Sequence, residues 1–216
     1  MLSLSGGFRP SRALVIGAHS DDIEIGCGGT ILDLVGRFPT LDVTWVVLAA
    51  VGDRRKEATD GASRFLGGIS EPVVLVEAFR ERYFPHLVEL KEFFDELGKT
   101  NQPDVIFCPW SGDAHQDHRT VAELTHNTFR SHMILEYEIP KTDGDLGKPT
   151  IYADLPPDLV QRKLELLQEC FPSQAHRSWF DPEVFRGLMR LRGMESQSSS
   201  GFAEAFHCRK LKISGP

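Results

Sequence analysis

Two short segments of this 216-residue chain place histidine and aspartate side chains close together. Residues 18–24 read AHSDDIE, and residues 113–118 read DAHQDH. Imidazole nitrogens and carboxylate oxygens are donors that a borderline metal ion such as zinc takes in proteins. A catalytic zinc site typically uses three protein ligands and leaves one position for water, whose pKa the ion lowers towards about 7. A neighbouring carboxylate can then remove the proton from that water. Together, the two segments predict a metal site that activates water.

The elements expected around these segments would bring them to one place. Apolar runs alternate with helical segments, which predicts a parallel sheet covered by helices on both faces, a Rossmann-like α/β fold. In such a sheet, ligands bind beyond the carboxyl ends of the strands, and the two polar segments follow the first and fourth strands. We expect strands at 13–17, 43–49, 73–76 and 104–108, and helices at 31–35, 57–66, 86–97 and 120–129.

Beyond residue 134 the pattern changes to a mixed C-terminal extension. Two further strands are expected on either side of a loop rich in Gly, Asp, Lys and Pro, and two helices follow before a serine-rich loop. The chain shows no internal repeat and no second domain, so residues 1–216 are interpreted as one domain. The expected ranges are 134–139 and 150–153 for the strands, 141–149 for the loop, 156–170 and 181–192 for the helices, and 196–201 for the serine-rich loop.

The composition limits the classes of partner and compartment. The formal net charge of -7 argues against nucleic acid as the main partner, because binding phosphates needs a basic surface. The four cysteines are widely spaced and form no C-x-x-C pair, which suits a reducing compartment. Residues 1–12 do not resemble a signal peptide, and no apolar stretch approaches the roughly 20 residues that span a bilayer. A cytoplasmic location is therefore expected.

The two segments resemble the motifs of the LmbE-like, or PIG-L, N-acetylglucosaminyl deacetylases. The first family motif reads A-H-[PS]-D-D-x-E, and residues 26–30, GCGGT, continue in the manner of the family. The second motif ends in H-x-D-H, as residues 115–118 do. The resemblance covers about the first 130 residues well. It continues more loosely through Ser173-Gln174, Arg192-Gly193 and residues 203–206.

The resemblance implies a role for each matching residue. It makes His19, Asp22 and His118 the metal ligands, with Zn²⁺ as the ion and Fe²⁺ as an alternative that the same donors accept. It makes Asp21 the general base. His115 would stabilise the oxyanion or protonate the leaving amine, and Asp117 would orient a histidine from outside the ligand set. Ser20 replaces the proline of most relatives and is expected to change the loop geometry little.

Simpler interpretations exist for several of these residues. A histidine beside two aspartates can also be a helix cap, but two such clusters in family order favour the metal site. The remaining histidines lack this context, although His176 could reach the substrate. The glycines around Cys27 do not fit G-x-G-x-x-G directly after the strand, so we expect them to let the backbone pass the metal loop and open the helix. Cys27 itself is interpreted as a small packing residue.

Arginines after the second and third strands suggest contacts with substrate. Arg54 and Arg55 follow one strand, and Arg80 and Arg82 follow the next, with a solvated face as the alternative. We predict that Arg82 and Arg54 bind substrate, since guanidinium groups grip phosphates and hydroxyls. Two arginines at the site would favour a phosphorylated or nucleotide-linked sugar.

The sequence as a whole predicts a zinc-dependent N-deacetylase that acts on a small N-acetylated sugar or sugar conjugate. Two alternatives stay open, an amidase for a non-sugar or thiol-conjugate amide and a sugar-binding relative without catalysis. A metallo-β-lactamase-like protein is disfavoured because Asp113 stands where that motif has histidine and the strand–helix alternation is wrong for that fold. Related enzymes are often oligomers, so a homo-oligomer is an open expectation.

Overall fold

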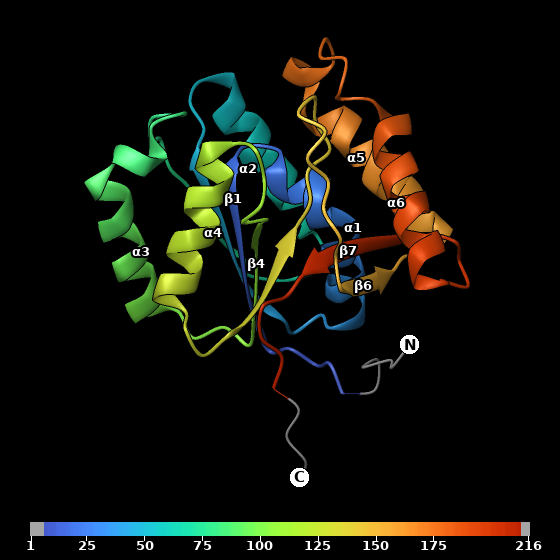
Figure 1. Ribbon diagram of the computed structural model, residues 1–216, viewed down its shortest axis with the longest axis horizontal. Helices are drawn as coiled ribbons and strands as arrows, with labels where there is room; N and C mark the ends of the chain where they lie inside the picture. Colours follow the sequence, from blue (N-terminus) through green and yellow to red (C-terminus); the bar gives the residue numbers. More distant parts are fainter. Residues whose placement is uncertain (1–6, 213–216) are drawn as a thin grey trace.

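The computed structural model describes residues 7–212 and contains a seven-stranded sheet in the order β3-β2-β1-β4-β5-β7-β6 (Figure 1). The strands are β1 (Arg12–His19), β2 (Asp42–Ala49), β3 (Val73–Val76), β4 (Val105–Pro109), β5 (Met133–Tyr137), β6 (Ile151–Asp154) and β7 (Ala203–His207). The helices are α1 (Asp22–Arg37), α2 (Asp53–Phe65), α3 (Val88–Thr100), α4 (Gln116–Thr128), α5 (Pro157–Cys170) and α6 (Pro182–Ser196). Strands β1 to β5 pair in parallel, which confirms the Rossmann-like α/β fold expected from the alternation.

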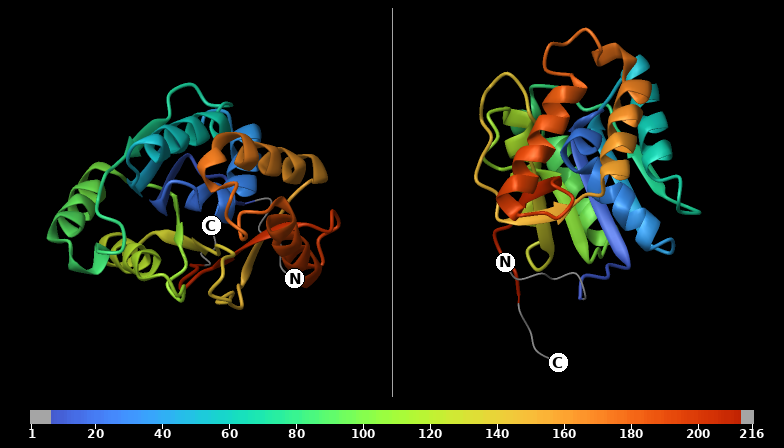
Figure 2. Two further views of the ribbon diagram at one scale, coloured as in Figure 1. Left: turned by 90° about the horizontal axis from the view of Figure 1, so that it is seen from above. Right: turned by 90° about the vertical axis from the view of Figure 1, so that its right-hand side faces the viewer.

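Alternate residues of the central strands point to opposite faces of the sheet, and each face has its own helices. On β1, Val15 joins an apolar cluster with residues of α1, α2, α5 and α6, whereas Leu14 and Ile16 join a second cluster with residues of α3 and α4. Figure 2 shows the corresponding layers from above, with α3 and α4 on one side of the sheet. Burial on both faces explains why the central strands are continuous apolar runs.

The C-terminal extension belongs to the same sheet. Strand β7 pairs antiparallel with both β5 and β6, so residues from the two ends of the chain share one hydrophobic core. The sequence predicted a strand near β6 but none at residues 203–207. Within residues 7–212, none of the helices has the length and apolarity needed to cross a membrane.

Helix α1 begins nine residues earlier than expected, and this corrects the interpretation of its glycines. Gly26 and Gly28 lie inside the helix, where a Cβ atom would come within 2.1 Å of the Tyr137 ring and within 2.5 Å of Phe65, respectively. They therefore admit neighbouring aromatic rings rather than opening the helix. The same early start places Asp22 in the first turn of α1.

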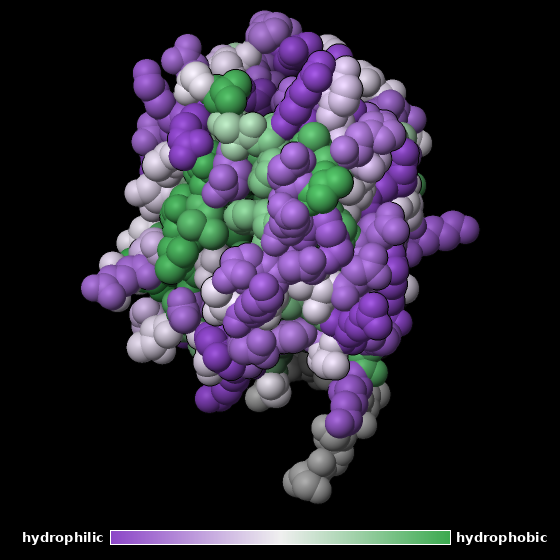
Figure 3. Space-filling view, turned by 90° about the vertical axis from the view of Figure 1, so that its left-hand side faces the viewer, coloured by the Kyte–Doolittle hydropathy of each residue, from purple (hydrophilic) through white to green (hydrophobic). Residues whose placement is uncertain are grey.

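An apolar patch lies on the side of the molecule that carries α3 (Figure 3). Strand β3 is the edge of the sheet on this side, and Val73 on β3 and Val88 at the start of α3 are exposed. Apolar residues beside an edge strand are typical of surfaces that associate with other proteins. Formation of a homo-oligomer stays a prediction, which sedimentation of the purified protein would test.

Candidate metal and catalytic site

The two polar segments meet at the carboxyl ends of β1 and β4. These strands are neighbours, although the chain leaves β1 towards β2 on one side and reaches β4 only later on the other. Such a switch point is where open α/β sheets bind ligands. His19 ends β1 and Asp22 begins α1, while His115 precedes α4 and His118 lies in its first turn. The structure thus brings together residues that are about a hundred positions apart.

Three donor atoms at this point form a nearly equilateral triangle. The distance from His19 Nδ1 to His118 Nε2 is 3.2 Å, from His118 Nε2 to Asp22 Oδ2 3.3 Å, and from Asp22 Oδ2 to His19 Nδ1 3.4 Å. A tetrahedral zinc ion bonded at about 2.0–2.1 Å separates its ligand atoms by about 3.3 Å. The three side chains therefore fit a zinc-type ion, and a ligand set of two imidazoles and one carboxylate also suits ferrous iron.

His115 stands beside this triangle as a fourth donor. The side-chain nitrogens of His19, His115 and His118 lie within 4.8 Å of one another, so these three histidines are a second group that could hold a metal ion. His115 Nδ1 accepts a hydrogen bond from the backbone N–H of Asp117 at 3.2 Å, which leaves Nε2 to carry the proton of a neutral ring. Burial and the nearby His118 and His19 lower the pKa of His115, which favours this neutral form. A neutral imidazole N–H suits stabilisation of an oxyanion.

A separate carboxylate orients each of the two histidines of the triangle. Asp117 Oδ2 lies 3.4 Å from His19 Nε2, and Asp113 Oδ2 lies 2.8 Å from His118 Nδ1. Each carboxylate thus faces the ring nitrogen that the triangle does not use, an arrangement typical of metal-binding histidines. The sequence predicted this role for Asp117 only. Asp113 was missed, although its position five residues before His118 was a usable signal.

Asp117 also fixes a strained loop at the edge of the site. Its carboxylate accepts hydrogen bonds from the backbone N–H groups of Arg82 at 2.5 Å and Phe84 at 3.3 Å. Arg82 has a left-handed backbone with φ of 66°, which is unfavourable for a residue other than glycine, and strained residues of this kind cluster at functional sites. The Arg82 side chain is exposed, so a contact with substrate stays a prediction.

Asp21 is buried beside the triangle and keeps one free oxygen. Its Oδ1 accepts a hydrogen bond from Arg54 Nη2 at 2.8 Å, whereas Oδ2 has no hydrogen-bond partner among the described residues. Burial raises the pKa of Asp21 despite the opposing charge of Arg54. Arg54 also donates from Nε to Ser20 Oγ, at 2.5 Å. The Arg54 guanidinium therefore contacts two residues of the first motif, Ser20 and Asp21. Its contact with substrate stays a prediction.

Neighbouring carboxylates favour the protonated forms of the two histidines of the triangle. Burial alone would lower the pKa of His19, but the Asp22 and Asp117 carboxylates outweigh it and raise that pKa to about 10. Burial opposes Asp22 and Asp113 in the same way at His118, whose pKa rises to about 9. The raised pKa values favour protonation of this histidine pair at pH 7, so a metal ion must displace a proton to bind.

We therefore expect zinc binding to release protons and to strengthen as the pH rises from 6 to 8. The apparent association constant should increase by up to about tenfold per pH unit for each proton displaced. Titration calorimetry in two buffers with different ionisation enthalpies counts the protons. An affinity that is independent of pH, with no proton released, would contradict this metal site.

The chain matches one protein family, and it resembles several solved structures. Residues 14–129, more than half of the chain, match the family described as PIG-L, GlcNAc-PI de-N-acetylase. The N,N'-diacetylchitobiose deacetylase from Pyrococcus horikoshii has a TM-score of 0.71 and 21% identity, with 96% of this chain and 87% of that chain covered. A zinc-inhibited form of the teicoplanin deacetylase Orf2 has a TM-score of 0.68 and 12% identity, with 91% and 97% covered.

The same fold also occurs in a protein with different chemistry. GalB, the 4-carboxy-2-hydroxymuconate hydratase from Pseudomonas putida KT2440, has a TM-score of 0.76 and 16% identity, with 95% of this chain and 99% of that chain covered. At such identities the likeness concerns the fold, and fold alone does not decide the reaction.

Proposed function

Because the chain belongs to the PIG-L family of GlcNAc-PI de-N-acetylases, we propose that it is a zinc-dependent hydrolase that removes the acetyl group from an N-acetylated sugar or sugar conjugate. The observation that carries the proposal is the triangle of His19, Asp22 and His118 with the unpartnered Asp21 oxygen beside it. In this proposal the triangle binds the metal ion, and Asp21 beside it is the base that takes a proton from water.

Each side chain has one task in the proposed reaction. A bound zinc ion would supply a Lewis acid and lower the pKa of water. Asp21 Oδ2 accepts the proton when water adds to the amide carbonyl carbon, and its raised pKa makes it a better base than an ordinary carboxylate. His115 donates its Nε2 proton in a hydrogen bond to the developing oxyanion. Protonated Asp21 then gives the proton it took from water to the amine nitrogen as the C–N bond breaks, giving acetate and a free amine.

Asp113 and Asp117 would act indirectly by keeping the histidine rings in place. Their contacts with His118 Nδ1 and His19 Nε2 set the ring orientations, and such outer carboxylates contribute roughly 10–100-fold to metal affinity or activity. Two histidines and one carboxylate accept zinc or ferrous iron, so both ions are included in the test.

The test is acetate release from a panel of N-acetylated mono- and disaccharides and nucleotide sugars. Metal-free protein is compared with protein given one equivalent of Zn²⁺ or Fe²⁺, because one structural relative is described in a zinc-inhibited form. We expect acetate release that chelation abolishes and one equivalent of metal restores. Hydrolysis confined to non-sugar amides would show that the substrate is a non-sugar amide and not an N-acetylated sugar. Metal binding without hydrolysis of any amide would overturn the enzymatic proposal.

A further inference from the structure

The long connection between β5 and β6, residues 138–150, lies beside the metal site. Figures 1 and 2 show that it rises past the end of β5, on the side of the sheet where β1 and β4 also end, before it returns to β6. The proposed reaction uses none of its side chains. Two separate groups of contacts nevertheless hold it, and only one of them reaches the metal-binding segment.

The first group is centred on Lys141. Its ammonium group lies 2.9 Å from Asp113 Oδ2 and 2.5 Å from Asp145 Oδ2, and its side chain is only 12% exposed. Asp145 Oδ2 also accepts a hydrogen bond from the backbone N–H of Ala114 at 2.6 Å. A largely buried cation thus bridges a carboxylate of the connection and a carboxylate of the 113–118 segment.

Asp113 links Lys141 to His118, a predicted metal ligand. Its Oδ2 contacts both Lys141 Nζ and His118 Nδ1, while its Oδ1 accepts a hydrogen bond from the backbone N–H of His115 at 2.7 Å. The carboxylate is therefore held from three sides. Lys141 therefore contacts Asp113, and Asp113 contacts Nδ1 of His118, whose Nε2 is one of the three atoms of the triangle.

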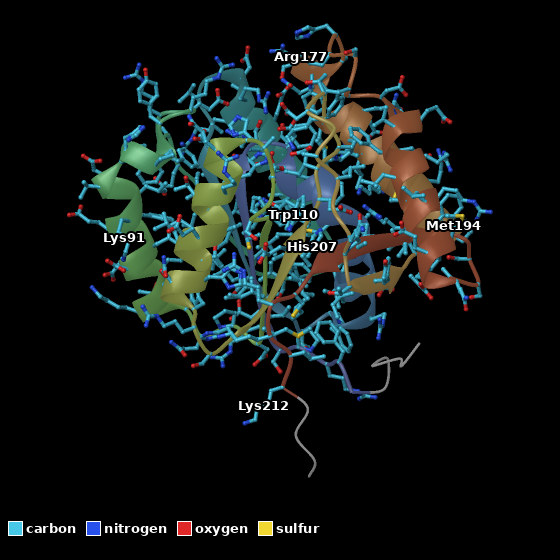
Figure 4. All side chains as sticks on the ribbon, viewed as in Figure 1. Lys91, Trp110, Arg177, Met194, His207 and Lys212 are labelled. Atoms are coloured by element: carbon cyan, nitrogen blue, oxygen red, sulfur yellow. The ribbon has the colours of Figure 1, made fainter. Side chains whose placement is uncertain are left out.

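The second group holds the connection without touching the metal-binding segment. Arg192 of α6 donates to both oxygens of Glu138 at 2.9 Å and to the carbonyl oxygen of Gly147 at 3.2 Å. Gly147 packs against Trp110, whose ring stacks on His207 with centroids 4.3 Å apart, and Figure 4 shows these two rings side by side. These contacts hold the connection at Glu138 and Gly147 independently of Lys141.

We propose that Lys141 is a positioning residue for the metal site: it fixes the Asp113 carboxylate, which in turn holds His118 with Nε2 directed at the ion. The inference rests on the proposed function only in taking His118 as a metal ligand. It assigns a role at the site to a residue from the C-terminal half of the chain, outside both sequence motifs.

The test compares Lys141→Met, Lys141→Arg and Glu195→Gln. Glu195 is the matched control, because it pairs with Arg192 at the second anchor of the same connection and does not contact Asp113. The zinc dissociation constant is measured by competition with a chelator, and the visible spectrum of Co²⁺-loaded protein reports the ligand geometry. We expect Lys141→Met to weaken zinc binding by about 10–100-fold and to change the cobalt spectrum. Lys141→Arg should recover most of the affinity, and Glu195→Gln should stay within about threefold of the parent.

A double variant separates positioning from simple charge repulsion. Without Lys141, the carboxylates of Asp113 and Asp145 would face each other with no cation between them, so Lys141→Met/Asp145→Asn removes that repulsion. Positioning predicts that the double variant binds zinc as weakly as Lys141→Met. Full recovery in the double variant would overturn the inference, as would parental zinc affinity and an unchanged cobalt spectrum in Lys141→Met.

Two further points keep the test decisive. If Lys141→Met does not fold, Lys141→Gln keeps a hydrogen-bond donor without the charge, and a smaller loss of zinc affinity in the same direction is expected from it. Failure of the proposed function would instead show in the parent protein, as zinc binding without amide hydrolysis. These zinc-affinity comparisons need no substrate, so the two failures are distinguishable.

Discussion

Replacing Asp21 by asparagine is expected to lower kcat for amide hydrolysis by about 10²–10⁴-fold, the usual contribution of a general base. Asparagine keeps the size of the side chain and an oxygen that can accept the Arg54 hydrogen bond, but its amide cannot take a proton from water. The zinc affinity of the variant should stay within a few-fold of the parent value, because Asp21 contributes no atom to the triangle. Acetate release under saturating substrate and zinc titration of the same preparation measure the two quantities.

The matched control is Asp33→Asn, the same chemical change within α1, the helix that Asp21 precedes. Asp33 pairs with the exposed Arg37 away from the site, so kcat should be unchanged in this variant. An Asp21→Asn protein that retains parental kcat would show that Asp21 is not the base. A loss of zinc affinity as large as the loss of rate would assign Asp21 a structural part in the metal site instead.

The residues proposed for the chemistry could be identified from sequence because they lie in two short segments. Each follows a strand whose apolar run is unmistakable, and the strand–helix alternation implies that parallel strands end at one edge. The family and the Rossmann-like fold that these patterns indicated are both confirmed. The roles of the individual side chains stay predictions, although the structure places His19, Asp22 and His118 in mutual contact.

What the sequence could not predict depends on contacts between distant segments. The start of α1 was placed too late because Gly26 and Gly28 weaken the helical signal, and their reason for being there is the bulk of Tyr137 and Phe65. Strand β7 was missed because its sequence, AEAFH, contains no β-branched residue, and the strand gains its hydrogen bonds from β5 and β6.

The contact of Lys141 with Asp113 was also missed, for the same physical reason. The two residues are 28 positions apart in sequence, and no local pattern indicates which carboxylate a lysine will reach. The residues of the two motifs could therefore be recognised in the sequence, whereas the residues that orient their side chains are brought to them only by the tertiary fold.

The second large effect concerns the stability of the fold and the buried ion pair between Lys163 and Glu204, which lies against α1. Lys163 of α5 donates from Nζ to Glu204 Oε1 at 2.7 Å and to the carbonyl oxygen of Ile25 at 2.6 Å. Glu204 of β7 also accepts hydrogen bonds from the backbone N–H groups of Gly29 and Thr30 at 2.8 and 2.7 Å. These bonds join α5 and β7 to α1, the helix whose first turn carries Asp22. The ion pair thus connects the C-terminal extension to the helix that follows the first sequence motif.

Lys163→Met is expected to lower the free energy of unfolding by about 3–5 kcal/mol, because it leaves a buried carboxylate without its cation. Lys91→Met is the control: Lys91 forms an exposed ion pair with Asp95, and such pairs contribute about 0–1 kcal/mol. Denaturant unfolding in the presence of chelator measures both variants without a contribution from bound metal. Lys163→Met/Glu204→Gln removes the unpaired charge, so it should be more stable than the sum of the two single variants predicts. A loss below about 1 kcal/mol in Lys163→Met would mean that water replaces the ammonium group, and that the C-terminal extension is held to α1 without the Lys163 ion pair.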